Sequence, residues 1–169
     1  MTAPLPITLR LASEAGTAAL AVALAPLLSP GDTLLLSGPI GAGKTHFARA
    51  LIQARLAAAG LSEDVPSPTF TLVQTYSDGD AEIWHADLYR LSGGADLAEL
   101  GLDWAFEEAI VLVEWPERLG SAAPKAALAI DFAQGSDESS RVLTFTATVP
   151  RWAGLVGQAL DAAALNADV

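Results

Sequence analysis

The sequence contains no cysteine and only two lysines, and both shortages exclude functions. Without cysteine the chain can form no disulfide bond, no thiolate metal site and no cysteine nucleophile. Nine basic residues stand against 20 acidic ones, which gives a net charge of −11. A surface this acidic repels a phosphate backbone, so direct and strong binding to nucleic acid is disfavoured. The charge either serves solubility or selects a protein partner, and that partner could itself handle nucleic acid.

Membrane-spanning and secretory segments are also missing. The richest apolar segment, residues 18–28, is too short to cross a bilayer and contains Pro26. Residues 1–11 lack a basic segment followed by an apolar one, so no secretory signal is evident. We therefore expect a cytoplasmic protein with no membrane association. Since 51% of the 169 residues are apolar, we expect a single packed domain over residues 1–169.

Short apolar strands alternate with helical patterns along the chain. Residues 33–37 and 109–113 are compact apolar runs, typical of strands buried on both faces. The predicted strands are 7–11, 33–37, 69–76, 82–89, 109–113, 128–132 and 142–148, and the predicted helices are 13–28, 44–60, 96–108 and 152–165. The predicted fold is α/β and P-loop NTPase-like, with a mainly parallel central sheet, flanking helices and antiparallel hairpin additions.

Residues 38–45 match the phosphate-binding motif G-x-x-x-x-G-K-[ST] in full, between a buried-type strand and a helical pattern. Glycines let the backbone curl so that successive N–H groups face one anion, and the helix N-terminus adds a positive dipole end. Lys44 would place its charge on the β- and γ-phosphates, and the Thr45 hydroxyl would reach Mg²⁺. The predicted nucleotide-binding loop comprises Gly38, Pro39, Ile40, Gly41, Ala42, Gly43, Lys44 and Thr45.

Two carboxylates are candidates for the chemistry beside this loop. Glu114 ends an apolar strand and could bind Mg²⁺ directly or through water, or it could simply face solvent. Asp87 lies inside an apolar and aromatic segment, where it could orient the attacking water or help hold the metal. Its alternatives are an ion pair with Arg90 or a turn cap. His85, two residues earlier, could equally be a hydrogen-bonded structural histidine.

Three further residues have two open interpretations each. Ser67 and Thr69 follow the loop helix, where nucleotide switches are common, and their hydroxyls could touch the γ-phosphate or Mg²⁺. They could instead cap a rigid turn. Trp115 follows Glu114, and its indole could pack on the adenine, on a partner or in the core. Plain packing is the role we expect for Trp84, Trp104 and Trp152.

The motifs that are missing bear on the nucleotide and on the reaction. No Asn-Lys-x-Asp motif for reading guanine occurs, because the only lysines are Lys44 and Lys125, so ATP is expected rather than GTP. A kinase clamps two phosphorylated substrates with several cations. Only Arg90 and Arg118 lie where a kinase lid is expected, which argues weakly against a small-molecule kinase. A nucleotide-gated binding module with incidental hydrolysis is a further alternative.

Four segments together resemble one family, TsaE, formerly called YjeE. They are the loop at 38–45, Ser-Pro-Thr-Phe-Thr-Leu at 67–72, His-Ala-Asp-Leu-Tyr-Arg at 85–90 and Val-Glu-Trp-Pro at 113–116. The loop is generic, whereas the last two strings make the resemblance specific. It covers about residues 8–148, and the segment from 150 to 169, which its own pattern predicts to be a terminal helix, matches nothing in it.

The resemblance implies a small α/β ATPase, weakly active alone, that works with TsaB and TsaD. That pair transfers a threonylcarbamoyl group to adenosine 37 of tRNA, and ATP hydrolysis would reset it between turnovers, so tRNA is met only indirectly. By motif position Thr45 corresponds to the magnesium threonine, and Asp87 and Glu114 to two essential acids, with both acids and Thr45 as candidate metal ligands. Ser67 and Thr69 fall in the switch segment. The nucleotide-binding set also takes in His46 and Trp115.

Two positions depart from the family pattern. His46 stands where threonine is often found after the magnesium threonine, and Ala86 stands where an aromatic residue is often found. Neither departure removes a hydroxyl or a carboxylate that the mechanism needs.

Overall fold

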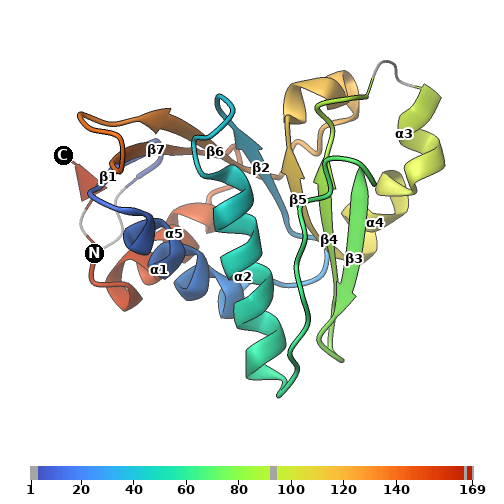
Figure 1. The fold of residues 1–169 in the computed structure, drawn as a ribbon, viewed down its shortest axis with the longest axis horizontal. Helices are drawn as coiled ribbons and strands as arrows, with labels where there is room; N and C mark the ends of the chain where they lie inside the picture. The colour runs from blue at the N-terminus through green and yellow to red at the C-terminus, as the bar shows by residue number, and fades with distance from the viewer. Residues whose placement is uncertain (1–3, 92–94, 166, 169) are drawn as a thin grey trace.

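The structure, a computed structural model, describes residues 4–91, 95–165 and 167–168. Figure 1 shows one twisted sheet with helices packed against it. The strands are β1 (Ile7–Leu11), β2 (Thr33–Ser37), β3 (Val73–Ser77), β4 (Glu82–Asp87), β5 (Ile110–Glu114), β6 (Leu128–Gln134), β7 (Arg141–Thr146) and β8 (Ala167–Asp168). The α-helices are α1 (Glu14–Leu24), α2 (Lys44–Ala58), α3 (Ala95–Leu100), α4 (Leu102–Glu108) and α5 (Arg151–Ala162), and the 3₁₀ helices are η1 (Ala25–Leu27) and η2 (Pro116–Ala122).

The sheet confirms the predicted α/β class. Its strand order is β3-β4-β5-β2-β6-β7-β1-β8. The pairs β4–β5, β5–β2 and β2–β6 are parallel, whereas β3, β7, β1 and β8 pair in antiparallel fashion. The carboxyl ends of four central strands therefore meet at one edge of the sheet, the edge at which open α/β sheets bind ligands.

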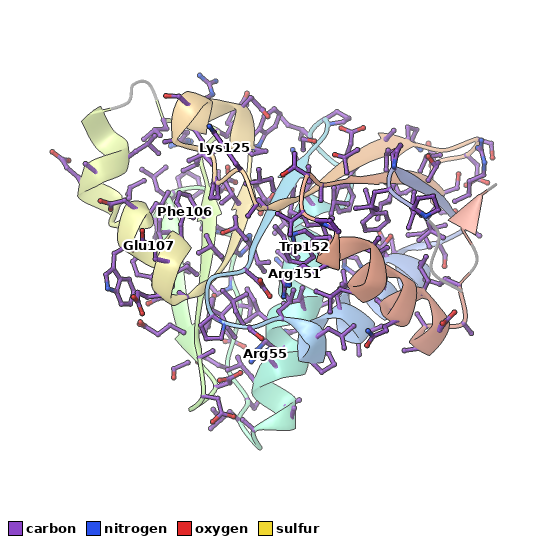
Figure 2. The ribbon with its side chains drawn as sticks, turned by 180° about the vertical axis from the view of Figure 1, so that it is seen from behind. Arg55, Phe106, Glu107, Lys125, Arg151 and Trp152 are labelled. Atoms are coloured by element: carbon purple, nitrogen blue, oxygen red, sulfur yellow. The ribbon has the colours of Figure 1, made fainter. Side chains whose placement is uncertain are left out.

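Helices cover both faces of this sheet. In Figure 1, α1 and α2 lie side by side over one face, and α5 packs against α1. Figure 2, seen from behind, shows α4 with its residue Phe106 over the opposite face. The alternation of side chains along a strand explains the two layers. Leu34 and Leu36 of β2 belong to the core cluster under α1 and α2, while Leu35 packs against the cluster on the other face.

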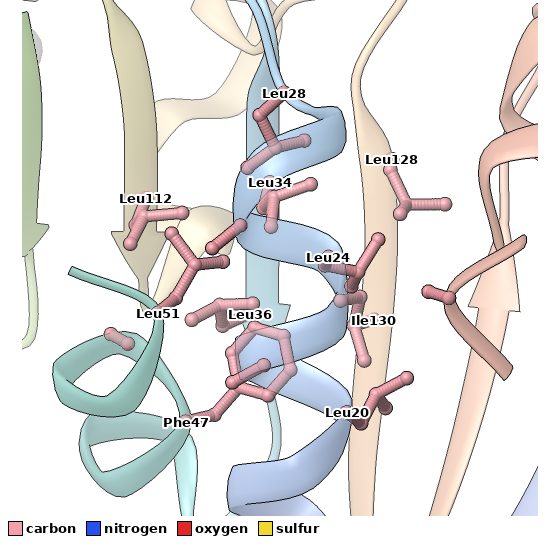
Figure 3. Close-up of a cluster of buried hydrophobic side chains, with 14 of the residues drawn as sticks. Leu20, Leu24, Leu28, Leu34, Leu36, Phe47, Leu51, Leu112, Leu128 and Ile130 are labelled. Carbon is pink, nitrogen blue, oxygen red and sulfur yellow. The ribbon is translucent and has the colours of Figure 1, made fainter. Parts of the chain in front are cut away.

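The larger core cluster fixes the start of α2, as Figure 3 shows. Phe47 and Leu51 of α2 point toward Leu36 and the neighbouring strands, and both are fully buried. The Phe47 ring meets the Phe132 ring edge-on, with centroids 5.7 Å apart. Burying apolar side chains of this size stabilises the fold by about 1.5–3 kcal/mol each. The helix that begins with Lys44 is thereby held in place by the buried side chains of its first two turns.

Four boundary predictions were wrong for a local reason, and several other elements differ from their predicted ends by one to three residues. The third strand begins at Val73, because Pro68 starts a turn over residues 68–71 in which the Leu72 N–H donates to the Pro68 carbonyl at 2.7 Å. The β4 strand ends at Asp87, since a turn follows it. The α1 helix ends at Leu24 and continues as η1, as expected where Pro26 lacks an N–H. The predicted helix 96–108 is two helices, because Gly101 takes a left-handed φ of 77°.

The sequence also predicts a helix cap at Ser13, a chain break at Gly93 and Gly94, and a helix cap at Asp96. Ser13 stands at the N-cap of α1, but its side chain makes no capping hydrogen bond. The predicted chain break at Gly93 and Gly94, and the cap predicted for the Asp96 side chain, lie outside what the structure describes. The short strand β8, which pairs with β1, was not predicted. Among the described residues, no helix combines the length and the apolar character needed to cross a membrane.

Candidate functional site

The predicted phosphate-binding loop connects β2 to α2, at the edge where the parallel strands end. Gly38 has φ 134°, and a Cβ there would collide with the Phe132 carbonyl oxygen, so only glycine fits at the start of the loop. Gly41 and Gly43 have φ values of 81° and 103°, which other residues rarely adopt. The backbone can therefore curl around the N-terminus of α2, where unpaired N–H groups and the helix dipole favour an anion.

A pocket of about 360 Å³ opens in front of this loop. It is lined by Ile40, Gly41, Gly43, Lys44, Thr45, His46, Thr69, Asp87, Tyr89, Glu114 and Trp115. Most of the residues predicted for the site are thus brought together. Gly38, Pro39 and Ala42 belong to the loop but do not line the pocket, and Ser67 reaches it only through a hydrogen bond to Thr69.

The two predicted acids stand side by side at the carboxyl ends of neighbouring parallel strands. Asp87 of β4 and Glu114 of β5 are register partners, and both are buried. Glu114 is only 2% exposed, so the alternative of a carboxylate facing solvent is wrong. Its Oε1 accepts a hydrogen bond from the Thr45 hydroxyl at 2.7 Å. The hydroxyl and the carboxylate expected at one metal ion are therefore already in contact.

Asp87 is held by the two segments that flank it. Its Oδ1 accepts the N–H of Tyr89 at 3.0 Å, and its Oδ2 accepts the Thr69 hydroxyl at 3.1 Å. Thr69 in turn lies 2.7 Å from the Ser67 hydroxyl. The turn-cap interpretation of Asp87 is thus correct for one oxygen. The other alternative was an ion pair with Arg90, but the Arg90 guanidinium lies over the Phe70 ring, 4.6 Å from its centroid. The chain from Ser67 through Thr69 to Asp87 couples the predicted switch segment to the acid.

Trp115 forms a wall of the pocket, not part of the deep core. The Lys44 ammonium lies 3.7 Å from the centroid of its ring, and the Tyr89 ring packs on it at 4.9 Å. Cations bind favourably to the face of an indole. Lys44 also donates to the carbonyl of Gly38. The Gly38 carbonyl and the Trp115 ring therefore hold the Lys44 ammonium at the pocket, and an anion could take their place.

Burial and charge oppose each other at Lys44. The side chain is 4% exposed, and this burial lowers its pKa from the usual value. The carboxylates of Glu114, Glu117 and Asp87 act in the opposite direction and raise it. A buried cation facing three carboxylates is a local balance of charge. Adding a phosphate to this pocket would favour the charged form of Lys44 further.

The oxygen atoms at the pocket suit Mg²⁺ bound together with a nucleotide. The candidate donors are the Thr45 hydroxyl and the carboxylates of Glu114 and Asp87. In the part of the chain that the structure describes, no three His, Cys, Asp or Glu side chains gather as a metal-binding group. Mg²⁺ does not require such a cage, because it usually takes one or two carboxylates and completes its shell with phosphates and water.

The remaining residues predicted for the site have mixed positions. His46 lines the pocket, and its Nε2 lies 3.1 Å from the Glu14 carbonyl oxygen, which ties the start of α2 to α1. Of the tryptophans expected to pack, Trp152 is fully buried, and its indole N–H donates to the Ala126 carbonyl at 2.7 Å. Trp104 is 49% exposed and leans on Trp84, so for Trp104 the packing expectation was only half right.

The role of His85 was left open by its sequence pattern, and Tyr89 was not singled out, yet both residues contact the site. His85 is fully buried, with its Nε2 2.6 Å from Glu114 Oε2. Thr45 and His85 therefore each hold one oxygen of the same carboxylate. The signal was available in the period of two, which places Ile83, His85 and Asp87 on one face of β4. His85 therefore lies on the same face as Asp87, one position earlier along that face, and its side chain can reach the residue that pairs with Asp87 on the neighbouring strand.

We expect His85→Leu to reduce ATP turnover about tenfold while leaving the affinity for ATP nearly unchanged, because one oxygen of Glu114 loses its partner. Residues that orient a metal ligand typically contribute 10- to 100-fold. His85→Gln keeps an N–H near the position of Nε2 and should restore most of the turnover. Steady-state kinetics and calorimetry on both variants test this. Equal losses in the two variants would contradict an orienting role for the N–H.

The fold and the site together define a P-loop protein of the α/β class. The family model described as "Threonylcarbamoyl adenosine biosynthesis protein TsaE" matches residues 11–143. The chain belongs to the TsaE family. It is 36% identical over 137 residues to the "tRNA threonylcarbamoyladenosine biosynthesis protein TsaE" of Bacillus subtilis, with 80% of this chain and 82% of the relative covered.

Other comparisons agree with this family. The protein of the same name from Rickettsia conorii is 43% identical over 105 residues, 62% of this chain. The match spans 58% of that relative and 60% of the one from Rickettsia felis, which is less than two thirds of either length. The crystal structure of Bacillus subtilis YdiB superposes with a TM-score of 0.74 at 30% identity, covering 95% of this chain and 97% of that one.

Proposed function

We propose that the protein binds and hydrolyses ATP with Mg²⁺ as an accessory protein of tRNA N6-threonylcarbamoyladenosine formation, working with TsaB and TsaD. The observation that carries the proposal is the meeting of Thr45, Glu114 and Asp87 in front of the Lys44 loop. Membership of the TsaE family and the names of its relatives support the pathway. The net charge of −11 fits contact with tRNA through protein partners and not directly.

The residues of the pocket divide the work between binding and chemistry. The glycine-rich turn and the N-terminus of α2 receive the phosphates, and the Lys44 ammonium leaves the Gly38 carbonyl and the Trp115 face to meet them. Trp115 and Tyr89 remain as an aromatic wall that excludes water. Positioning and neutralisation of charge are the main contributions that a protein makes to phosphoryl transfer.

The two acids act at the γ-phosphate end of the pocket. Thr45 and Glu114 would hold Mg²⁺, the first directly and the second directly or through water. When bound, Mg²⁺ neutralises the charge on the phosphate oxygens. Asp87 takes no part in the hydrogen bond between Thr45 and Glu114. It accepts a hydrogen bond from Thr69, which connects it to the predicted switch segment. Asp87 is therefore the better placed of the two to orient the attacking water.

The pocket favours hydrolysis over a small-molecule kinase. Lys44 is the one lysine or arginine among the described residues that line it. A kinase holds two phosphorylated substrates, and several cations are needed to neutralise them. An experiment with a non-hydrolysable ATP analogue distinguishes an ATPase from a binding module that does not need hydrolysis. That analogue would support repeated tRNA modification only if hydrolysis were incidental.

We expect GTP to bind more weakly than ATP, because no carboxylate motif that reads guanine occurs in the sequence. Competition of each nucleotide against a fluorescent ATP analogue measures the difference. If ATP and GTP displaced the fluorescent analogue equally, the pocket would not distinguish the two bases. The preference for ATP would then be contradicted.

Reconstituted tRNA modification tests the proposed role directly. TsaB and TsaD, tRNA and the threonylcarbamoyl donor are incubated with ATP, and modified tRNA per complex is counted with and without this protein. The proposal predicts a single round without the protein and many rounds with it. Transfer of the γ-phosphate to a metabolite in the absence of TsaB and TsaD would instead identify a kinase.

A further inference from the structure

The phosphate-binding loop has a support on its outer side that belongs to none of the motifs. Arg141 is the first residue of β7, on the hairpin that adds antiparallel strands to the parallel sheet. Its Nε donates to the Ala42 carbonyl at 2.9 Å, and its Nη2 donates to the Gly41 carbonyl at 3.1 Å. One guanidinium therefore binds two consecutive carbonyls of the loop.

The base of this contact is rigid. The Arg141 backbone pairs with Gln134 of β6 on one side and with Leu11 of β1 on the other. Its Nη1 donates to the carbonyls of Glu138 and Ser140, at 2.6 and 2.8 Å. The guanidinium is thus fixed by its own hairpin loop, so the positions of the remaining N–H groups are set before the phosphate-binding loop meets them.

The geometry of the peptide bond turns this contact into an effect on the pocket. In a planar trans peptide the C=O and the N–H point in opposite directions. When Arg141 holds the Ala42 carbonyl on the outer side, the Gly43 N–H must point to the inner side. Gly43 lines the pocket whereas Ala42 does not, and the Ala42 N–H is occupied by the Pro39 carbonyl at 3.2 Å.

The positive charge of Arg141 also lies beside the phosphate-binding loop, where it would attract an anion. Among the described residues, the Arg141 guanidinium donates to four backbone carbonyls. Across the described ranges 4–91, 95–165 and 167–168, no ion pair of Arg141 with a carboxylate is found. In a chain with nine basic residues, an arginine beside the loop contributes to the potential that an anion meets there.

We infer that Arg141 is a positioning residue for nucleotide binding: its guanidinium clamps the Gly41 and Ala42 carbonyls, holds the shape of the loop and thereby presents the Gly43 N–H to a nucleoside triphosphate. This inference rests on the proposed ATP binding. Arginine suits the task because its five donors form a rigid planar fork, whereas a lysine ammonium cannot hold two neighbouring carbonyls in one fixed geometry. A site formed before its ligand arrives binds more tightly, because less order must be created on binding.

Two measurements on Arg141→Met and Arg141→Lys test the inference. The first is ATP affinity by calorimetry, where we expect Arg141→Met to raise Kd about tenfold or more, as for loss of a charged hydrogen-bond donor. Arg141→Lys should recover only part of this. The second is hydrogen exchange of the Ala42 amide in the protein without nucleotide, which should become at least about tenfold faster in Arg141→Met while core amides keep their rates.

Arg151→Met is the matched control. Arg151 also makes a two-pronged hydrogen bond, to Asp32 at 2.8 and 3.2 Å, but at the opposite end of β2, beside Trp152 as Figure 2 shows. The Arg151→Met variant should change neither the ATP affinity nor the hydrogen-exchange rate of the Ala42 amide. Unchanged Kd in Arg141→Met overturns the inference, and so does unfolding of both Arg141 variants, which would make the contact a general structural one. If the wild type itself does not bind ATP, the proposed function is wrong, and the exchange rates still decide whether the clamp exists.

Discussion

Asp87→Asn and Glu114→Gln should each lose ATP hydrolysis by about 10²- to 10⁴-fold while keeping ATP affinity within a few-fold of the wild type. Both carboxylates line the pocket at the ends of two paired strands, where the γ-phosphate of the proposed ATP would lie. Removing a charge there damages the transition state more than the ground state. Calorimetry and steady-state turnover, measured on the same preparations, give the two quantities.

The amide substitutions separate chemistry from folding. They keep the shape of the side chains and an acceptor for the hydroxyls of Thr69 and Thr45. The Asp87→Ala and Glu114→Ala variants should behave similarly and still dock on TsaB and TsaD, yet fail to support repeated rounds of tRNA modification. Wild-type turnover in any of these variants would show that the residue is not catalytic. Early melting together with loss of ATP binding would instead assign both acids to the fold.

Lys44→Ala should abolish measurable ATP binding, with a rise in Kd of about 100-fold or more. The phosphates lose the one lysine or arginine among the described residues of the pocket, and a charge-assisted hydrogen bond with it, a contribution of a few kcal/mol. Calorimetry measures the loss. Lys44→Met keeps the length of the side chain and should lose binding equally, which separates charge from packing.

Lys125→Ala is the control for this experiment, since Lys125 is the only other lysine in the chain. Lys125 does not line the pocket, and Figure 2 shows it on the face of the molecule that is seen from behind. Its described contact is through its carbonyl, which accepts a hydrogen bond from the Thr148 hydroxyl at 2.7 Å. The Lys125 variant should therefore bind ATP like the wild type. An unchanged affinity in Lys44→Ala would reject this pocket as the ATP site.

The loop and its neighbouring acids were predictable because their patterns are local. A full phosphate-binding motif between a buried strand and a helix defines one geometry, and the strand that ends in Glu114 was recognisable as a run of five apolar residues. The parallel pairing of β4, β5 and β2 then brings Asp87 and Glu114 to the same edge as the loop. A mainly parallel central sheet was likewise expected from two buried-type strands, 33–37 and 109–113, in a chain that alternates strands with helices. That β4 and β6 join them in parallel was not predicted.

The features that could not be predicted depend on contacts distant in sequence. Thr69 reads as part of an alternating strand, but Pro68 and the hydrogen bond from Thr69 to Asp87 favour a turn instead. The role of His85 depends on a carboxylate 29 residues away, and that of Arg141 on carbonyls about 100 residues away. Single-sequence patterns carry no information on such pairs. These contacts also fix the positions of Asp87, Glu114 and the phosphate-binding loop relative to one another.

Turnover of radiolabelled ATP, with and without TsaB and TsaD, tests the central claim most directly. Wild-type protein should release phosphate slowly alone and much faster with both partners, and Glu114→Gln should remain slow in either case while still binding ATP. Inorganic phosphate must be the labelled product. If the two partners leave the wild-type rate unchanged, or if Glu114→Gln responds to them like the wild type, the account of this pocket as a partner-stimulated ATPase site is contradicted.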